Sequence, residues 1–297
     1  MIVSLRIVTD SACDLPTHIV EEYDIHVLPF LVYLEGRERV DGVDITPEEV
    51  YAAIRADKVP TTGQVPLETF LTVFTEYARE GTPCLYLSFS SKLSGTCSTA
   101  RLALQEVKRA YPSAQITIVD TLSGSLGQGL IVLEAAQMAR MGKPAEEIIQ
   151  HVQQRSQNNI EHVFSVDDLR YLYRGGRLKF TSAFLGSLLN VKPILHVKDG
   201  LMVPFQKVRG KKMAVKRIVE LVKERSLGHP EQLIAISHAD DPKAADQLKA
   251  LLKDTLGYRK FLVNKVGSVL GCHIGIGGVS AFFVNTTYPE PNISALP

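Results

Sequence analysis

A hydroxyl-rich stretch, SFSSKLSGTCSTA at residues 88–100, is the first place in the sequence where side chains could do chemistry. It follows an apolar run at residues 83–87 and leads into a predicted helix at 100–110. A nucleophilic Ser94 would need a neighbouring base and an oxyanion hole. The G-x-S-x-G pattern of many hydrolases is incomplete here, because Lys92 stands where its first glycine belongs.

The same stretch has two other interpretations. A strand that ends in a polar loop before a helix presents free N–H groups and the positive end of the helix dipole, which together favour a negative oxygen. Ser94 would then add a hydroxyl donor to an anion site. Alternatively, Ser94 only caps the N-terminus of its helix. The residues of this stretch alone leave the anion site and the cap equally open.

Two other segments place polar side chains beside glycines. In VPTTGQVP, residues 59–66, Thr62 lies in a loop before a helix that is predicted to begin near Pro66, a pattern typical of a capped turn. In GCHIGIGG, residues 271–278, we expect His273 in a glycine-rich loop that could approach a ligand closely. A predicted strand follows this loop, so it is not a dinucleotide-binding fingerprint, and the chain lacks the nucleotide P-loop pattern.

A cationic segment, DDLRYLYRGGRLKF, occupies residues 167–180. If its first part is helical, two arginines lie one turn apart on the same side, and a third follows two glycines. With the downstream QKVRGKK segment they could bind phosphate or an acidic partner. The alternative is a solvated face whose charges pair with neighbouring aspartates. The arginines concerned are Arg170, Arg174, Arg177 and Arg209.

The composition limits the class of function. The 297 residues carry a formal net charge of +1, with 45% hydrophobic and 22% charged residues, which is typical of a globular protein. This balance provides no overall field that would recruit nucleic acid or a membrane surface. The four cysteines form no C-x-x-C pair, which favours buried thiols in a reducing compartment over a metal site. We therefore expect a cytoplasmic protein with no metal, no cofactor, no signal peptide and no membrane insertion.

The elements that must position these residues alternate between strands and helices in the first half. One strand-like run extends through IHVLPFLVYLEG, residues 25–36. A later helix carries a capping box, with Thr46 at its N-cap and Glu49 three residues on. Repeated strand–helix units predict a mostly parallel sheet with helices on both faces.

The second half has a different pattern. Two strand-like runs meet at Asp199 and Gly200, which predicts a tight hairpin and therefore antiparallel strands. The fold class is α/β with two domains, and the sheet of the second is mixed or antiparallel. We place the domains at residues 1–160 and 161–290, with the ligand site formed by both.

Taken in order, the motifs of this chain resemble the DegV family, whose members include the fatty acid-binding subunits of bacterial fatty acid kinase. The resemblance extends over nearly the whole chain, from about residue 6 to residue 283. One such motif would be weak, but the ordered set is specific. The motifs are IVTDSACDLP, TTGQVP, LSFSSKLSGTCSTA, IVDTLSGSLGQG, DDLRYLYRGGRLKF, SHADDP and GCHIGIGG.

The resemblance implies a set of site residues. The family holds a carboxylate with a threonine and a serine, which correspond to Thr62 and Ser94. His273 matches the family's histidine near the carboxylate, and Arg170 matches an arginine of its R-x-x-x-x-G-R segment. The sequence departs from the family in TTGQVP, where Gly63 stands in place of a usual serine and Val65 is interposed before Pro66.

The resemblance also implies a function. The protein would bury the tail of a long-chain fatty acid such as palmitate and present its carboxylate to a separate kinase subunit, which forms the acyl phosphate. The arginine-rich segment is then a candidate for contact with phosphate or the kinase. Candidate walls for the tail are LPFLVYL and SAFLGSLLNV, at residues 28–34 and 182–191. The rival interpretation is a hydrolase or transferase that uses Ser94 as its nucleophile.

Overall fold

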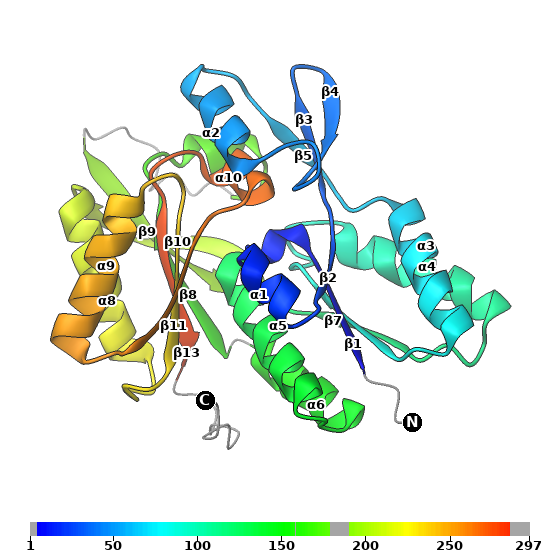
Figure 1. Ribbon diagram of the computed structural model, residues 1–297. Coiled ribbons are helices and arrows are strands. Elements are labelled where there is room, and N and C mark those ends of the chain that lie inside the picture. The colour runs from blue at the N-terminus through cyan, green and yellow to red at the C-terminus, as the bar shows by residue number, and fades with distance from the viewer. Residues whose placement is uncertain (1–4, 158, 179–189, 286–297) are drawn as a thin grey trace.

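The computed structural model describes residues 5–157, 159–178 and 190–285. It contains three β-sheets with helices packed around and between them (Figure 1). The strands of the first sheet come from residues 6–120, and those of the largest sheet come from residues 160–284. The α/β class that the sequence predicts is confirmed, as is the contrast between a parallel and a mixed sheet.

The first sheet is parallel throughout, and both of its faces are covered by helices. Its two central strands, β1 and β6, are buried at every residue except Arg6, as expected for strands that are covered on both sides. Val8 and Tyr86 pack towards α3 and α4, whereas Leu85 and Leu87 pack towards α5 and α6. In spatial order the strands are β2 (His26–Leu28), β1 (Arg6–Asp10), β6 (Cys84–Ser88) and β7 (Ile116–Asp120). The helices named here are α3 (Leu67–Glu80), α4 (Thr96–Ala110), α5 (Ser125–Arg140) and α6 (Ala145–Arg155).

The second sheet was not predicted from the sequence. The expected continuous strand over residues 25–36 divides at Pro29, because proline lacks a backbone N–H and restricts the residue before it. Its first part remains in the parallel sheet, and its second part starts an antiparallel sheet that stands beside helix α2 (Figure 1). The strands, in spatial order, are β4 (Arg37–Val40), β3 (Leu31–Leu34) and β5 (Thr61–Gly63), and α2 spans Pro47–Arg55.

The third sheet is mixed. Its one parallel pair is β11 with β12, and its other pairs are antiparallel. The predicted hairpin is present, with φ of 52° at Asp199 and 79° at Gly200 in the turn between β9 and β10. In spatial order the strands are β10 (Leu201–Arg209), β9 (Val191–Lys198), β8 (Ile160–Ser165), β13 (Val279–Val284), β11 (Leu233–His238) and β12 (Lys260–Lys265).

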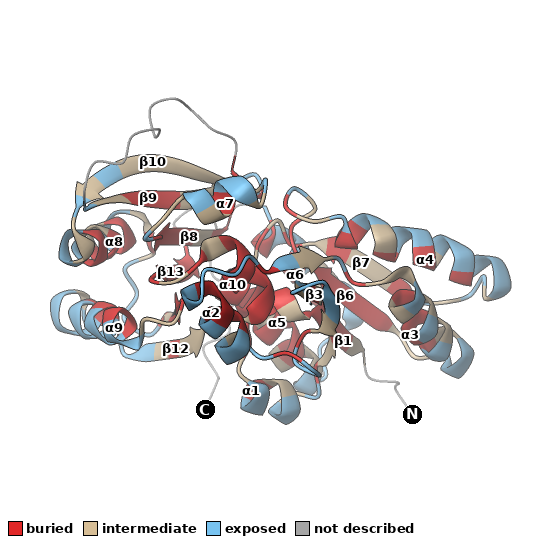
Figure 2. Ribbon diagram, turned by 90° about the horizontal axis from the view of Figure 1, so that it is seen from above, coloured by how far each residue is buried: buried red, intermediate tan, exposed pale blue. Residues whose placement is uncertain are grey.

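Helix α5 joins the two large sheets. It contacts β1 and β6 of the parallel sheet and also β8, β11 and β13 of the mixed sheet. Most of its residues are therefore buried, and Figure 2 shows it in the middle of the molecule. On the far side of the mixed sheet, α8 (Lys211–Arg225) and α9 (Pro242–Leu256) form a separate apolar layer. The candidate site lies near the N-terminal end of α5, beside the loop that follows β6.

Three short helices complete the described chain. The helix α10 (Ser268–Ile274) contacts α2, β3 and β5, so a late segment of the chain reaches back to an early one. The hydroxyl of Tyr51 on α2 donates a hydrogen bond of 3.0 Å to the carbonyl of Val266 just before α10. The other two are α1 (Thr17–Glu22) and α7 (Arg170–Arg174), and a 3₁₀-helix, η1 (Ser11–Cys13), follows β1.

The general features of the composition also have structural counterparts. All four cysteines are buried and unpaired, as the sequence predicts for small apolar core residues. Among the residues that the structure describes, no helix is long and apolar enough to cross a membrane. The same residues contain no group of three or more His, Cys, Asp or Glu side chains that could hold a metal ion.

Candidate functional site

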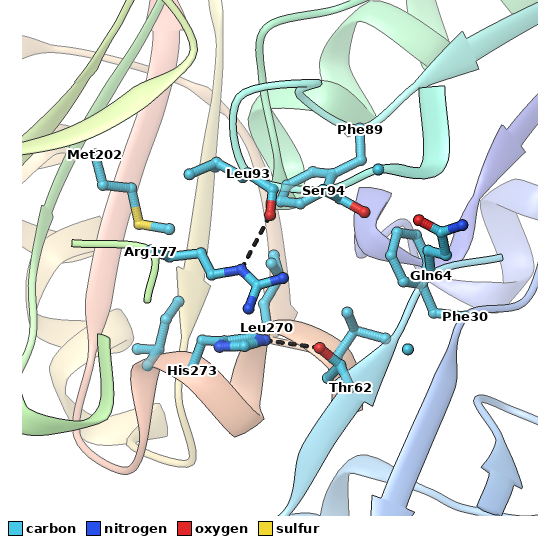
Figure 3. A pocket seen from close by; sticks show the side chains of 14 residues that line it. Phe30, Thr62, Gln64, Phe89, Leu93, Ser94, Arg177, Met202, Leu270 and His273 are labelled. Atoms are coloured by element: carbon cyan, nitrogen blue, oxygen red, sulfur yellow. Dashed lines mark hydrogen bonds between the residues drawn. The ribbon is translucent and has the colours of Figure 1, made fainter. Parts of the chain in front are cut away.

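A cavity of about 240 Å³ lies where the loop after β6, strand β5, helix α10 and the turn after α7 meet. Figure 3 shows that Thr62, Ser94, Arg177 and His273 approach this space from different elements. Four residues that are up to 211 positions apart in the chain thus line one cavity. The remaining lining residues are Phe30, Gly63, Gln64, Phe89, Leu93, Gly95, Met202, Val269, Leu270 and Ile274.

Ser94 hydrogen-bonds the first turn of a helix and also lines the cavity. Its hydroxyl oxygen accepts a hydrogen bond of 3.2 Å from the N–H of Thr96, the first residue of α4. The hydroxyl of Thr96 lies 2.9 Å from the same oxygen. Gly95, not Ser94, is the N-cap residue of α4. The sequence left open whether Ser94 serves a helix N-terminus or an anion site. In the structure its side chain is positioned for both.

Thr62 belongs to a strand and not to the loop that the sequence predicts. It pairs with Val32 of β3, which fixes its position beside α10. The next residue, Gly63, lies against Tyr33, whose ring would be 3.0 Å from an added Cβ atom. A serine at position 63 would therefore crowd this tyrosine. Gln64 then donates a hydrogen bond of 2.6 Å to the hydroxyl of Thr99 on α4, which links the strand to the start of that helix.

His273 lies in helix α10, and the prediction of a glycine-rich loop around it is wrong. The helix ends at Ile274, and Gly275, whose φ of 72° suits glycine, is its C-cap. Gly271 therefore lies within the helix, and the other glycines of the motif follow it. His273 Nε2 is 2.8 Å from the hydroxyl oxygen of Thr62, while Nδ1 is buried without a hydrogen-bond partner. Burial and the nearby charge of Arg177 lower the pKa of His273 to about 4, so its ring is neutral at pH 7.

Arg177 is the one permanently charged side chain among the described residues that line the cavity. Its Nε donates a hydrogen bond of 3.0 Å to the carbonyl of Leu93, and its Nη1 donates one of 2.6 Å to the carbonyl of Gly175. Burial lowers the pKa of Arg177, but guanidinium groups remain charged in proteins. The cavity therefore has a positive electrostatic potential beside neutral hydroxyl groups.

The structure separates Arg177 from the other arginines of the predicted cationic set. Arg170 is exposed and forms an ion pair of 2.6 Å with Asp168. The Arg174 guanidinium lies 5.1 Å from the ring centre of Tyr171. Arg209 is exposed at the end of β10 and is not among the residues that line the cavity. The predicted helix is present as α7, but of the four arginines only Arg177 lines the cavity.

The polar cavity adjoins a second, apolar pocket, and the two share several lining residues. The inner pocket is small, about 40 Å³, and its surface is almost entirely carbon. Its polar side chains turn their polar atoms elsewhere: His162, for example, bonds the carbonyl of Ile160 at 3.0 Å through Nδ1. Both spaces are lined by Phe89, Leu93, Met202, Leu270 and Ile274, and the inner one also by Gly124, Ser125, His162, Phe164, Val197, Ser280 and Phe282.

These pocket residues differ from the apolar segments singled out in the sequence. Of LPFLVYL, only Phe30 lines the polar cavity, and Leu28 and Val32 belong to the core. Most of SAFLGSLLNV lies outside the described residues. The residues that line both spaces come from several elements and form no apolar run in the sequence, so no single segment indicates them.

A buried carboxylate, Asp14, holds the segment that leads into α10. It accepts hydrogen bonds from the N–H of Gly267 at 2.9 Å and from the hydroxyl of Ser125 at 2.5 Å. Its own carbonyl accepts a bond of 2.8 Å from Asn264. Burial, with smaller contributions from Asp41 and other nearby charge, raises the pKa of Asp14 to about 7. Asp14 thus connects the loop after β1 to the entrance of the His273 helix.

This raised pKa predicts the direction in which stability changes with pH. The folded protein keeps a proton on Asp14 that the unfolded chain releases near pH 3.8, so the contribution of Asp14 to stability is fully present below that pH and is lost as the pH rises through about 7. Asp14→Asn should flatten this part of the curve of unfolding free energy against pH. Asp57→Asn, at an exposed position after the end of α2, is the matched control substitution. Equal slopes in wild type and Asp14→Asn would contradict the assignment.

Comparisons with known proteins agree with this architecture. The family model described as the DegV family matches residues 4–286 of the chain. A DegV domain-containing protein of Clostridium perfringens is 39% identical over 284 residues, which are 95% of this chain and 97% of the relative. A structure described as fatty acid binding of a DegV family protein from Thermus thermophilus is 32% identical with a TM-score of 0.87, covering 95% of this chain and 99% of that one. The structure of DegV, a fatty acid binding protein from Bacillus subtilis, is 30% identical with a TM-score of 0.82, covering 96% and 100%.

Proposed function

Because the chain belongs to the DegV family, we propose that it binds a long-chain fatty acid such as palmitate. The carboxylate is held by the hydroxyls of Thr62 and Ser94, with His273 behind Thr62, and the tail enters the inner apolar pocket. The observation that carries this proposal is that the polar cavity and the inner pocket adjoin each other, because Phe89, Leu93, Met202, Leu270 and Ile274 line both. An anionic head group suits the polar cavity, and an apolar tail suits the lining of the inner pocket.

The polar end suits a carboxylate for electrostatic reasons. A carboxylate only accepts hydrogen bonds, and hydroxyl groups can donate them. Arg177 adds a positive charge beside the same space, and its two hydrogen bonds are to backbone carbonyls and not to a carboxylate. An anion that leaves water for this cavity would thus exchange its hydration for donors and a nearby cation.

The inner pocket suits a hydrocarbon tail, although it is narrow in the described state. Burial of apolar surface contributes about 0.8 kcal/mol for each CH₂ group, so a long tail supplies most of the affinity. The residues shared by both spaces include the flexible side chains of Met202 and Leu270. We propose that these side chains move apart when a tail enters, because the inner pocket has a volume of only about 40 Å³.

We further propose that the protein is a non-catalytic carrier in the cytoplasm that presents the bound carboxylate to a separate fatty acid kinase subunit. In this proposal both domains, 1–160 and 161–290, contribute to the site. Arg170, Arg174 and Arg209 then serve as contacts for the kinase or for phosphate, and Arg177 lies nearest the head group. Arg170→Ala should lower kinase turnover without changing fatty acid affinity, since its side chain is exposed. Unchanged turnover would remove Arg170 from this role.

The contacts of Ser94 give little support to the rival hydrolase or transferase. Its recorded partners are the hydroxyl and N–H of Thr96, whereas the imidazole in the same cavity bonds Thr62. A nucleophilic serine would need that base within reach. A serine-reactive phosphonate probe separates the two proposals: a carrier leaves Ser94 unlabelled, and stoichiometric labelling of Ser94 would favour the enzyme.

The direct test of the carrier proposal is mass spectrometry of lipid extracted from freshly purified, denatured protein. We expect a stoichiometric fatty acid of about 14 to 18 carbons, because each buried CH₂ adds about 0.8 kcal/mol of affinity. An empty protein that also fails to bind added palmitate or oleate would contradict the proposal. In that case Gly63, the departure within TTGQVP, would be the first place to look for a different head group.

A further inference from the structure

The glycine turn after α7, residues 174–177, packs directly against the imidazole of His273. A Cβ atom added to Gly175 would lie 2.2 Å from His273 Nδ1 and 3.1 Å from Cε1. Only a glycine therefore fits at position 175 while the ring keeps its place. The hydrogen that glycine carries in the direction of a Cβ atom points at Nδ1. Gly175 thus contacts one nitrogen of the ring, and Thr62 contacts the other.

The two nitrogens of this ring have different surroundings. His273 is only 8% exposed, and its Nδ1 has no hydrogen-bond partner. A hydrogen on Nδ1 would face the Cα–H of Gly175 without an acceptor, whereas a bare Nδ1 accepts a weak C–H contact from it. Nε2 has the hydroxyl oxygen of Thr62 at 2.8 Å as a ready acceptor. The surroundings therefore favour the neutral tautomer with its hydrogen on Nε2.

We propose that Gly175 is a positioning residue that holds His273 in the Nε2–H tautomer and so makes Thr62 a hydrogen-bond donor to the ligand. Thr62 accepts from His273 Nε2–H, and its own hydroxyl hydrogen is then left to point into the cavity. This inference deepens the proposed function and rests on it for the identity of the ligand. Its chemical consequence is a site that requires an accepting head group, and a carboxylate fulfils this requirement better than a neutral ester.

The same turn also holds the other side of the cavity. Arg177 bonds the carbonyl of Gly175 at 2.6 Å and the carbonyl of Leu93, next to Ser94, at 3.0 Å. The turn therefore connects the histidine to the serine loop through backbone carbonyls. This contact explains why two glycines precede Arg177: Gly175 makes room for the ring, and Gly176 adopts a φ of 71° that turns the chain.

The tautomer can be measured without any ligand by ¹⁵N NMR of the histidine ring in the full chain. We expect the His273 signals to show a bare Nδ1 and a protonated Nε2 at pH 7, since the two nitrogen states have well-separated shifts. The signals are assigned by their loss in His273→Gln. A protonated Nδ1 would overturn the inference, whether or not the protein binds a fatty acid.

The effect on head-group choice is tested with Gly175→Ala and the matched control Gly176→Ala. The control strains the same turn at a positive φ but has no atom within 4 Å of an added Cβ, so it leaves His273 in place. The measured quantity is the ratio of the affinities for hexadecanoate and methyl hexadecanoate. We expect this ratio to fall about tenfold in Gly175→Ala and to stay unchanged in the control. A merely structural defect would weaken both ligands equally, and an unchanged preference would overturn the role of Gly175.

The outcomes for the two proposals are distinguishable. If the wild-type protein binds no fatty acid, the proposed function fails, while the NMR experiment still decides the tautomer. If the wild type binds hexadecanoate but its His273 carries the hydrogen on Nδ1, only the positioning inference fails. If Gly175→Ala does not fold, the NMR measurement on the wild type remains the deciding test.

Discussion

Replacing Thr62 by valine is expected to weaken hexadecanoate binding by about 10- to 100-fold. A hydrogen bond to a charged group contributes about 1.5–3 kcal/mol, and about 1.4 kcal/mol corresponds to a factor of ten in affinity. Valine keeps the branched shape that suits strand β5, so the change removes the hydroxyl with little effect on packing. It also leaves His273 Nε2 without its hydrogen-bond partner at 2.8 Å, which lowers the stability of the free protein. Isothermal titration of delipidated protein measures the loss.

The neighbouring residue offers a matched control for this prediction. Thr61 lies on the same strand but is exposed and does not line the cavity. Thr61→Val should therefore bind hexadecanoate as the wild type does. Ser94→Ala should show a loss of similar size to Thr62→Val, because both hydroxyls are assigned to the same carboxylate. Equal affinity in Thr61→Val and Thr62→Val would show that the carboxylate lies elsewhere.

The second large effect concerns the ligand tail. Affinity should rise about fourfold for each CH₂ group added to a saturated fatty acid, because each group contributes about 0.8 kcal/mol when it enters the inner pocket. From octanoate to hexadecanoate, which differ by eight CH₂ groups, this amounts to almost five orders of magnitude, or about 6.4 kcal/mol, before the cost of opening the pocket. A series of competition titrations with even-numbered chains measures the slope.

The head group is the same throughout this series, so the slope reports only on the tail. We expect it to level off when the chain reaches the end of the pocket, near Phe164 and Phe282. Val197 lines the inner pocket but not the polar cavity. The larger side chain in Val197→Phe should therefore shorten the chain length at which the affinity levels off. A flat series would mean that the tail stays outside the inner pocket and would exclude that part of the proposal.

Local signals in the sequence predicted much of the fold. The capping box at Thr46 and Glu49 is present, with the Glu49 N–H bonded to the Thr46 hydroxyl and the Thr46 N–H bonded to Glu49. The turn at Asp199 and Gly200 is also present, since positive φ angles suit those residue types. Such signals depend on a few adjacent residues, so they survive in any tertiary context.

Two features were missed although the sequence contains signals for them. The break at Pro29 separates β2 from β3 and creates the antiparallel sheet that carries Thr62. Helix α8 was not predicted, yet its buried residues recur at helical spacing through KKMAVKRIVELVKER. The strand-like residues on both sides of Pro29 conceal the break, and the many basic residues of α8 conceal its helical spacing.

The candidate site itself could be predicted only in part. Thr62, Ser94 and His273 were each singled out, and the structure places all three around one cavity. Their convergence depends on how α10 packs against β5, which no local pattern reveals. Arg177 was predicted to lie with the exposed arginines, but the two glycines before it turn its side chain into the cavity. Nothing in the sequence indicated that Gly175 makes room for His273.

The most direct test of the central claim is a crystal structure of the protein with hexadecanoate that carries bromine on its terminal carbon. Anomalous scattering locates the tail end, and the electron density locates the carboxylate in the same experiment. The account predicts carboxylate oxygens within hydrogen-bond distance of the Thr62 and Ser94 hydroxyls, and a bromine peak in the inner pocket beyond Phe89. A bromine peak at the surface, or a carboxylate away from both hydroxyls, would contradict it.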